Sequence, residues 1–342
     1  MTEPARSARD APPFRSAMGL VTRTAPFLLL NLAIYGGSFL VLVLWLGTFG
    51  GLAVLFGERV EILAFIFMMM AILGPIVLLS LGKRYFLYLV KGAHIATMTK
   101  LITHGELPGG QGQVEYGRGV VRRYFKEVSV LFALERMVDR TARGFTRRFV
   151  RIVDWLPLGG GASKAARWAQ TVVNRSLQYV DQAVISHVIA KEDENIWSSA
   201  RDGLVLYAQA YPPILATSVK VWLMGKAFYL LALVLLAVPG IALLVAFSAG
   251  WFQVAVVVGV LVGAQLLVLC VFEPFATAWT LATYHHATDG LQMNEEWRGR
   301  LEQASDHFGK LGNRARDFTR DVGGMGGDVR DATSGGAGAG AG

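Results

Sequence analysis

The sequence predicts an all-α fold: a polytopic integral membrane protein with four transmembrane helices in two hairpins and a large helical cytoplasmic segment between them. Residues 227–272 contain no Asp, Glu, Lys or Arg, which is enough chain for two crossings of about 20 residues each. Residues 24–57 and 62–82 are also free of charge. Charged residues make up 17% of the chain, against about 25% in a typical soluble domain. Apolar helices inside a bilayer account for these observations.

Changes in charge and glycine content divide the chain into six expected segments. These are a disordered basic N-terminus (1–23), a first transmembrane hairpin (24–82), a basic amphipathic helical cytoplasmic segment (83–226), a second transmembrane hairpin (227–288), an amphipathic heptad-like C-terminal helix (289–322) and a disordered Gly/Ala tail (323–342). The four spans are expected near residues 26–50, 60–82, 227–248 and 251–284. The glycines of the first run predict a break or a strong tilt there.

The distribution of basic residues predicts the orientation of these spans, because Lys and Arg concentrate on the cytoplasmic side. Residues 83–226 hold 21 Lys and Arg against 11 Asp and Glu. The N-terminal segment is rich in Arg, whereas the links inside the two hairpins carry only Arg59. We therefore expect both termini and the central segment in the cytoplasm. The Phe-rich and Gly-rich composition, with Arg favoured over Lys, suggests a bacterial inner membrane.

Motifs of enzymes and cofactor sites are missing from the sequence. It has no His-Glu-x-x-His, Gly-x-Ser-x-Gly or Gly-x-x-x-x-Gly-Lys-Ser/Thr motif. The single cysteine, Cys270, excludes an intramolecular disulfide and a cysteine zinc site. His285 and His286 are adjacent, and adjacent helical side chains point about 100° apart, so an interfacial anchor is favoured over a haem or metal ligand. We predict a non-enzymatic protein without cofactor or metal.

The central segment contains a basic amphipathic helix over about 116–156. Apolar residues recur at spacings of three and four, and a row of arginines occupies the other side: Arg136, Arg140, Arg143, Arg147 and Arg151. These arginines are candidates for binding anionic lipid headgroups, with the apolar face sunk into the membrane interface. A helix packed on its protein neighbours, with a solvated charged face, explains the pattern equally well. Nucleic acid is not expected as a partner, because these basic residues adjoin membrane helices.

A heptad-like seam follows the last span. Its apolar positions are spaced alternately by four and three residues, and they include Trp297, Leu301, Phe308, Leu311 and Phe318. The seam is a candidate surface for self-association or for a partner helix. Packing on the protein's own central segment is the slightly favoured alternative, because that segment offers a matching stripe.

Polar residues within the apolar runs are candidates for a transport path. Glu273 lies near the inner end of the fourth span, where an acidic side chain is costly unless it is paired or hydrated. Pro274 removes a backbone donor there. Gln265, about two turns earlier, and Asn31 are further candidates for this path. The alternative is an interfacial glutamate paired with Lys226 or with a basic residue of the central segment.

Two pairs of glycines are candidates for close helix packing. They form the motifs Gly47-x-x-x-Gly51 and Gly259-x-x-x-Gly263, and small residues at this spacing let two membrane helices approach closely. The motif does not distinguish packing within one chain from packing between copies.

The last two-thirds of the chain resembles the C-terminal part of the choline transporter-like family. Asn174-Arg175 is followed by Tyr179 and later by Ser199-Ala200-Arg201, and two membrane helices come after them. The family has an Asn-Arg-x-x-Tyr-like stretch, a Ser-Ala-Arg helix and two membrane helices in the same order. It also has about ten membrane helices and a large outer loop, which this chain lacks. The resemblance implies membrane transport and does not imply choline.

Three functions are compatible with these patterns, of which the third is a membrane enzyme or cofactor carrier that uses His285 and His286. The first is an oligomeric membrane transport or pore component, whose path runs past Gln265 and Glu273. The second is a membrane scaffold or shaping protein, which binds anionic lipid through its central basic helix and a partner through its C-terminal helix. The transport function is favoured narrowly.

Overall fold

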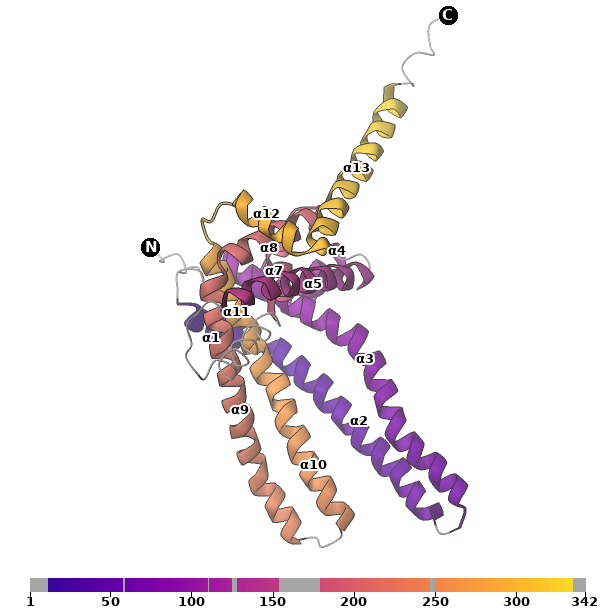
Figure 1. Cartoon of the computed structure of the whole chain (residues 1–342). Coiled ribbons are helices and arrows are strands. Elements are labelled where there is room, and N and C mark those ends of the chain that lie inside the picture. The colour runs from indigo at the N-terminus through magenta and orange to yellow at the C-terminus, as the bar shows by residue number, and fades with distance from the viewer. Residues whose placement is uncertain are drawn as a thin grey trace, which may run out of the picture. The chain divides into compact units, whose positions relative to one another are not determined.

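The computed structural model describes residues 12–57, 59–109, 111–124, 128–153, 179–246 and 250–334. All regular structure in these ranges is helical, and no strand occurs in them (Figure 1). The all-α fold predicted from the sequence is therefore confirmed. The chain forms two compact units, Met1–Arg123 with Val219–Thr283 and Tyr124–Ser218 with Tyr284–Gly342.

The first unit contains the long apolar helices. Its elements are α1 (Pro13–Arg23), α2 (Ala25–Gly57), α3 (Glu61–His104), α4 (Gln113–Tyr124), most of α9 (Tyr211–Ala246), α10 (Gly250–Leu267), the π-helical segment η2 (Val268–Phe272) and most of α11 (Glu273–Thr288). Helices α2 and α3 pack side by side as an antiparallel hairpin (Figure 1). Gly240 and Gly263 bring α9 and α10 together, because their α-carbons face Val260 and Leu236.

Among the described residues, three helices are long and apolar enough to cross a bilayer: Ala25–Gly57, Tyr211–Ala246 and Val256–Thr288. Most residues in them are not buried inside the protein, and large side chains such as Leu44, Leu235 and Val245 are exposed. A soluble protein rarely exposes so much contiguous apolar surface, so these helices are compatible with a membrane protein. The predicted second span, residues 60–82, lies in α3. The side chains of α3 are described as far as Gly74 in this region, and the apolar stretch Glu61–Gly74 is shorter than a membrane crossing.

Of the two alternatives predicted for the first span, the break is absent, because α2 is a single uninterrupted helix despite its glycines, and the strong tilt stays a prediction. A lipid environment explains this continuity, since a break would leave backbone N–H and C=O groups without partners in the hydrocarbon. The helix is held to α3 in its apolar part. The Trp45 indole donates to the Met70 carbonyl at 3.0 Å, and Gly74 leaves room for the Trp45 ring.

The N-terminal segment also differs from the prediction, since residues 13–23 form α1 rather than a disordered chain. Pro13 occupies the start of the helix, where its missing N–H costs nothing. Ala17 and Leu20 are buried one turn apart. Phe14 packs edge-on against Trp279 with ring centroids 5.0 Å apart. Residues 1–11 lie outside the described ranges.

The second unit is a packed layer of helices. It contains α5 (Val128–Val153), α7 (Val180–Lys191), α8 (Ile196–Gln209), α12 (Glu295–Ala304) and α13 (Asp306–Ser334). Helix α5 packs against α7, α8, α12 and α13, and α8 packs against α7, α12 and α13. Asn195 caps α8 by accepting from the Ser198 N–H. Helix α8 ends at Gln209 and α9 starts at Tyr211, just before the two prolines Pro212 and Pro213.

The predicted C-terminal helix over 289–322 is two helices. Ser305, between α12 and α13, has an extended backbone, and Gly144 of α5 leaves room for this turn. Serine competes for backbone hydrogen bonds and favours helix ends. The second of these helices continues to Ser334, although residues from 323 onward were predicted to be disordered. No proline interrupts that stretch, and residues 335–342 lie outside the described ranges.

The contact between α4 and α3 gives a direct test of the first unit. A Cβ added at Gly117 of α4 would stand 2.3 Å from the backbone oxygen of Ala93 in α3. The backbone cannot move aside cheaply, so we expect Gly117→Ala to destabilise the unit by about 1–3 kcal/mol. At Gly119, two residues later, nothing lies within 4 Å, and Gly119→Ala should stabilise the helix by about 0.5–1 kcal/mol. Thermal unfolding in detergent measures both, and equal stability of the two variants would contradict this packing.

Candidate functional site

A cluster of polar side chains lies where α2 meets the π-helical segment before α11. The backbone oxygen of Asn31 and the Tyr35 side chain, one turn apart on α2, lie in this region, and Cys270 and Glu273 come from the other side. The π-helical turn has a local cause. Pro274 has no N–H, and in an α-helix its ring would collide with the Cys270 carbonyl, so a wider turn relieves the clash.

The geometry of the cluster follows from this turn. The Glu273 N–H donates to the Val268 carbonyl, five residues earlier, which is the π-helical pattern. The Cys270 thiol donates weakly to the backbone oxygen of Asn31 at 3.9 Å. Tyr35 lies close enough to Cys270 and Glu273 to interact with both electrostatically. Cys270 is buried, and the Asn31, Tyr35 and Glu273 side chains are half-buried.

Buried aromatic side chains flank Glu273 in the sequence. Phe272 is buried and packs on Phe228 of α9 with ring centroids 5.7 Å apart. Gly225 leaves space for the Phe272 ring, because a Cβ there would meet it at 2.8 Å. Phe275 and Trp279, on the next turns of α11, are buried as well. Glu273 thus stands where an exposed apolar helix becomes a helix buried in protein.

The structure brings together only part of the predicted transport path. Asn31 lies on α2, which packs on η2, and Glu273 follows η2 directly as the first residue of α11. Gln265 is exposed on α10, next to the buried Ala264. The prediction assumed an unbroken α-helical period from Gln265 to Glu273, and the π-helical turn changes that period. Tyr35 was missed, although a polar residue four positions after Asn31 on an apolar helix was a readable signal.

The predicted packing glycines are mostly not at helix contacts within the chain. Gly47, Gly51 and Gly259 have nothing within 4 Å of a built Cβ, whereas at Gly263 the Leu236 side chain stands 3.1 Å away. The first three positions are therefore not used for packing within the chain, and their use in packing between copies stays a prediction. Close contacts between neighbouring helices occur at other glycines instead: Gly74 lies against Trp45, and Gly240 lies against Val260.

The arginine row of the central segment lies on a helix that packs on protein. Leu134, Val138 and Ala142 of α5 are buried, so the apolar face is not free to enter a membrane interface. The Arg136, Arg140 and Arg143 side chains are exposed, and the Arg143 guanidinium is 2.8 Å from the Asp139 carboxylate. The side chains of Arg147 and Arg151 lie outside the described part of α5.

The heptad-like seam is largely used inside the second unit. Leu301, Phe308 and Leu311 are buried, while Trp297 and Phe318 are half-buried. The chain turns at Ser305, so the seam does not form one straight surface for a partner helix. The packing of α12 and α13 on α5 and α8 occupies its centre.

The histidine pair points in two directions. His285 is 5% exposed and lies 2.7 Å from the Ser186 hydroxyl, while His286 is exposed. A serine next to a histidine resembles a nucleophile and its base, but Ser186 is fully buried, so a substrate cannot reach it. In the described part of the chain no three His, Cys, Asp or Glu residues are grouped as metal ligands.

A buried histidine in the first unit was also missed. The His94 ring of α3 lies 3.0 Å from the Thr24 hydroxyl and stacks on Phe27 with ring centroids 4.6 Å apart. Burial lowers the pKa of His94 to about 3. His94 therefore joins α3 to the start of α2 as a neutral ring.

Comparison of the chain with protein-family models, with curated proteins and with solved structures gives no match. The resemblance to the choline transporter-like family therefore stays a prediction. The function has to be argued from the residues and their geometry.

Proposed function

We propose that this chain is a non-enzymatic membrane transport component that passes protons or small cations past Glu273, and that it works as an oligomer. In this proposal the chain crosses a bacterial inner membrane four times, in two hairpins, with both termini in the cytoplasm. The observation that carries the proposal is the position of Glu273 in an apolar candidate span, at a π-helical turn and beside Tyr35.

The chemistry of this position favours ion or proton movement. A carboxyl group inside a bilayer is costly and is retained where it pairs, meets water or carries a proton. Pro274 leaves the Cys270 carbonyl without its usual α-helical donor. A carboxylate, a phenol and a backbone carbonyl at one level of the membrane are suitable partners for a proton or a small cation.

The four-span arrangement is supported by the first unit. Residues 62–82 carry no charge, lie in the first half of α3, and are long enough to cross the bilayer once. The end of α2 and the end of α9 lie at the same end of this unit (Figure 1). Two hairpins with tips on one side return both termini to the other side.

The oligomer is supported by polar and small residues on the exposed surface of the spans. Gln265 is exposed on an apolar helix, and an amide facing lipid is costly unless it pairs with another polar group. Gly47, Gly51 and Gly259 are not covered within the chain. A second copy packed on these faces would cover them.

The test is cation or proton flux into liposomes that contain the purified protein. We expect Glu273→Gln to lower flux by about tenfold or more, because the amide keeps the shape but cannot ionise. Glu273→Asp should retain part of the flux. Glu61→Gln is the matched control, since Glu61 is exposed at the hairpin tip, and it should leave the flux unchanged.

The variants are compared at equal insertion and equal oligomer mass. Wild-type flux that survives Glu273→Gln unchanged would contradict the proposal. Absence of flux from the wild type would contradict the transport function and favour the scaffold function.

A further inference from the structure

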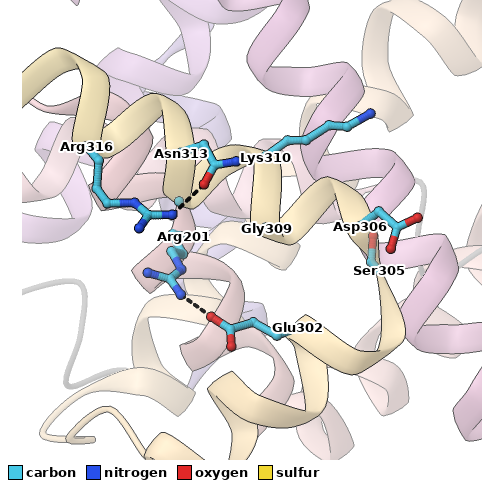
Figure 2. Close-up of a pocket in the computed structure, with 9 residues that line it drawn as sticks. Arg201, Glu302, Ser305, Asp306, Gly309, Lys310, Asn313 and Arg316 are labelled. Atoms are coloured by element: carbon cyan, nitrogen blue, oxygen red, sulfur yellow. Dashed lines mark hydrogen bonds and ion pairs between the residues drawn. The ribbon is translucent and has the colours of Figure 1, made fainter.

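A polar pocket of about 550 Å³ lies between α8, α12 and α13 in the second unit (Figure 2). Its lining includes Arg201 from α8, Glu302 from α12, and Lys310, Asn313 and Arg316 from α13. All these residues belong to the second unit, whereas the cluster around Glu273 belongs to the first unit.

Two guanidinium groups converge in this pocket. Figure 2 shows Arg201 and Arg316 extending from different helices toward the same space, whereas Lys310 points away from them. Like charges repel, so two converging guanidiniums are stabilised when an anion lies between them. Nearby carboxylates neutralise only part of this positive charge. Glu302 pairs with Arg201, and the Asp306 side chain points away from both arginines (Figure 2).

The donors of Arg201 are only partly used. One Nη donates to Glu302, and the buried Nε has no hydrogen-bond partner in the described part of the chain. The Phe308 ring supports the guanidinium, with its centroid 5.0 Å from the central carbon, and a Cβ at Gly312 would stand 3.4 Å from the same carbon. A fixed guanidinium with unused donors is preorganised for an acceptor.

The Arg316 guanidinium has Asn313 as its hydrogen-bond partner. It donates to the Oδ1 of Asn313, which leaves the amide N–H groups of Asn313 available to donate to a third atom. Two guanidiniums and one amide therefore offer hydrogen bonds from several directions.

The pocket lining carries more basic than acidic side chains. The five charged side chains that line the pocket are three basic and two acidic. A concave surface with an excess of positive charge raises the local concentration of anions.

We propose that Arg201, Asn313 and Arg316 bind the phosphate group of an anionic ligand. A phosphate presents several charged oxygens in a tetrahedral arrangement and accepts from more than one guanidinium, whereas a carboxylate is satisfied by a single fork. The phosphate belongs either to the headgroup of an anionic lipid or to a soluble phosphorylated compound. The chemistry recognised is the same in both cases.

The test measures binding to the full-length protein in a neutral detergent. Calorimetric titration with inorganic phosphate, against chloride at equal ionic strength, probes the soluble form. Native mass spectrometry counts phosphatidylglycerol retained by the protein, against phosphatidylcholine, and probes the headgroup. We expect Arg316→Gln to weaken one of these two binding signals by about tenfold, because one charge-assisted interaction is lost.

Two further variants keep the result interpretable. Arg320→Gln removes an exposed arginine from the same helix, outside the pocket, and should leave binding unchanged. Glu302→Gln frees Arg201 from its carboxylate and should strengthen binding, an effect that misfolding cannot imitate.

The two arms separate the sources. Phosphate binding that depends on Arg316 supports a soluble ligand, and retention of phosphatidylglycerol that depends on Arg316 supports a lipid headgroup. The proposal is overturned if neither anion binds the wild type above its control, or if Arg316→Gln and Arg320→Gln behave alike.

Discussion

Phe308→Ala is expected to destabilise the second unit by about 3–5 kcal/mol, the usual cost of removing a buried phenyl ring. The Phe308 side chain is 0% exposed, in the helix that packs on α5 and α8. The ring also supports the Arg201 guanidinium. Its removal leaves a cavity and takes away this cation–π contact. Chemical denaturation in detergent, followed by hydrogen exchange of α8 and α13, measures the loss.

Phe318→Ala is the matched control, because this phenylalanine of the same helix is half-buried. It should cost clearly less than Phe308→Ala. Equal costs for the two variants would mean that α13 does not pack as described. Hydrogen exchange localises the effect to the second unit, which separates it from a general loss of folded protein.

Acidification from pH 7 to pH 5 is expected to destabilise the first unit by about 2 kcal/mol through His94. The pKa of His94 is lowered to about 3 in the folded protein, against about 6.5 in an unfolded chain. Between these values the unfolded state binds more protons than the folded state, so stability falls as the pH falls. The loss begins near pH 6.5 and continues toward pH 3. Above pH 6.5 the contribution no longer changes.

Thermal unfolding at pH 7 and pH 5 measures this effect, with His94→Gln as the comparison. Glutamine keeps a polar group near Thr24 but does not titrate, so the variant should lose most of the pH dependence. His286→Gln removes an exposed histidine and should keep the wild-type dependence. Identical pH profiles for wild type and His94→Gln would contradict the buried neutral ring.

The fold class could be read from the sequence because charge-free runs of this length have few explanations other than membrane helices. The break before Pro212 was equally readable, since proline interrupts backbone hydrogen bonding locally. The turn at Ser305 was not, because the heptad pattern continues through it. Only the packing of Leu301 and Phe308 into one core decides that the chain turns there.

Only part of the candidate site could be predicted from the sequence. Glu273 and Pro274 are recognisable from the sequence, because an acidic residue and a helix-breaking proline are unusual in an apolar run. The contacts of Asn31 and Tyr35 with this turn depend on the pairing of helices more than 200 residues apart in the chain, and one sequence does not carry that information. The same limit hid the contact between Thr24 and His94. Helix α5 was ambiguous for a different reason, because an apolar stripe suits lipid and protein equally.

The most direct measurement is carbodiimide labelling of Glu273 in intact membranes, read by mass spectrometry. Carbodiimides modify protonated carboxyl groups, and hydrophobic and water-soluble reagents reach different compartments. We expect the hydrophobic reagent to modify Glu273 and the water-soluble reagent to spare it, while the exposed Glu106 reacts with the water-soluble one. Modification of Glu273 by the water-soluble reagent as fast as Glu106 would place this carboxyl in bulk water and contradict a proton or cation path through the membrane.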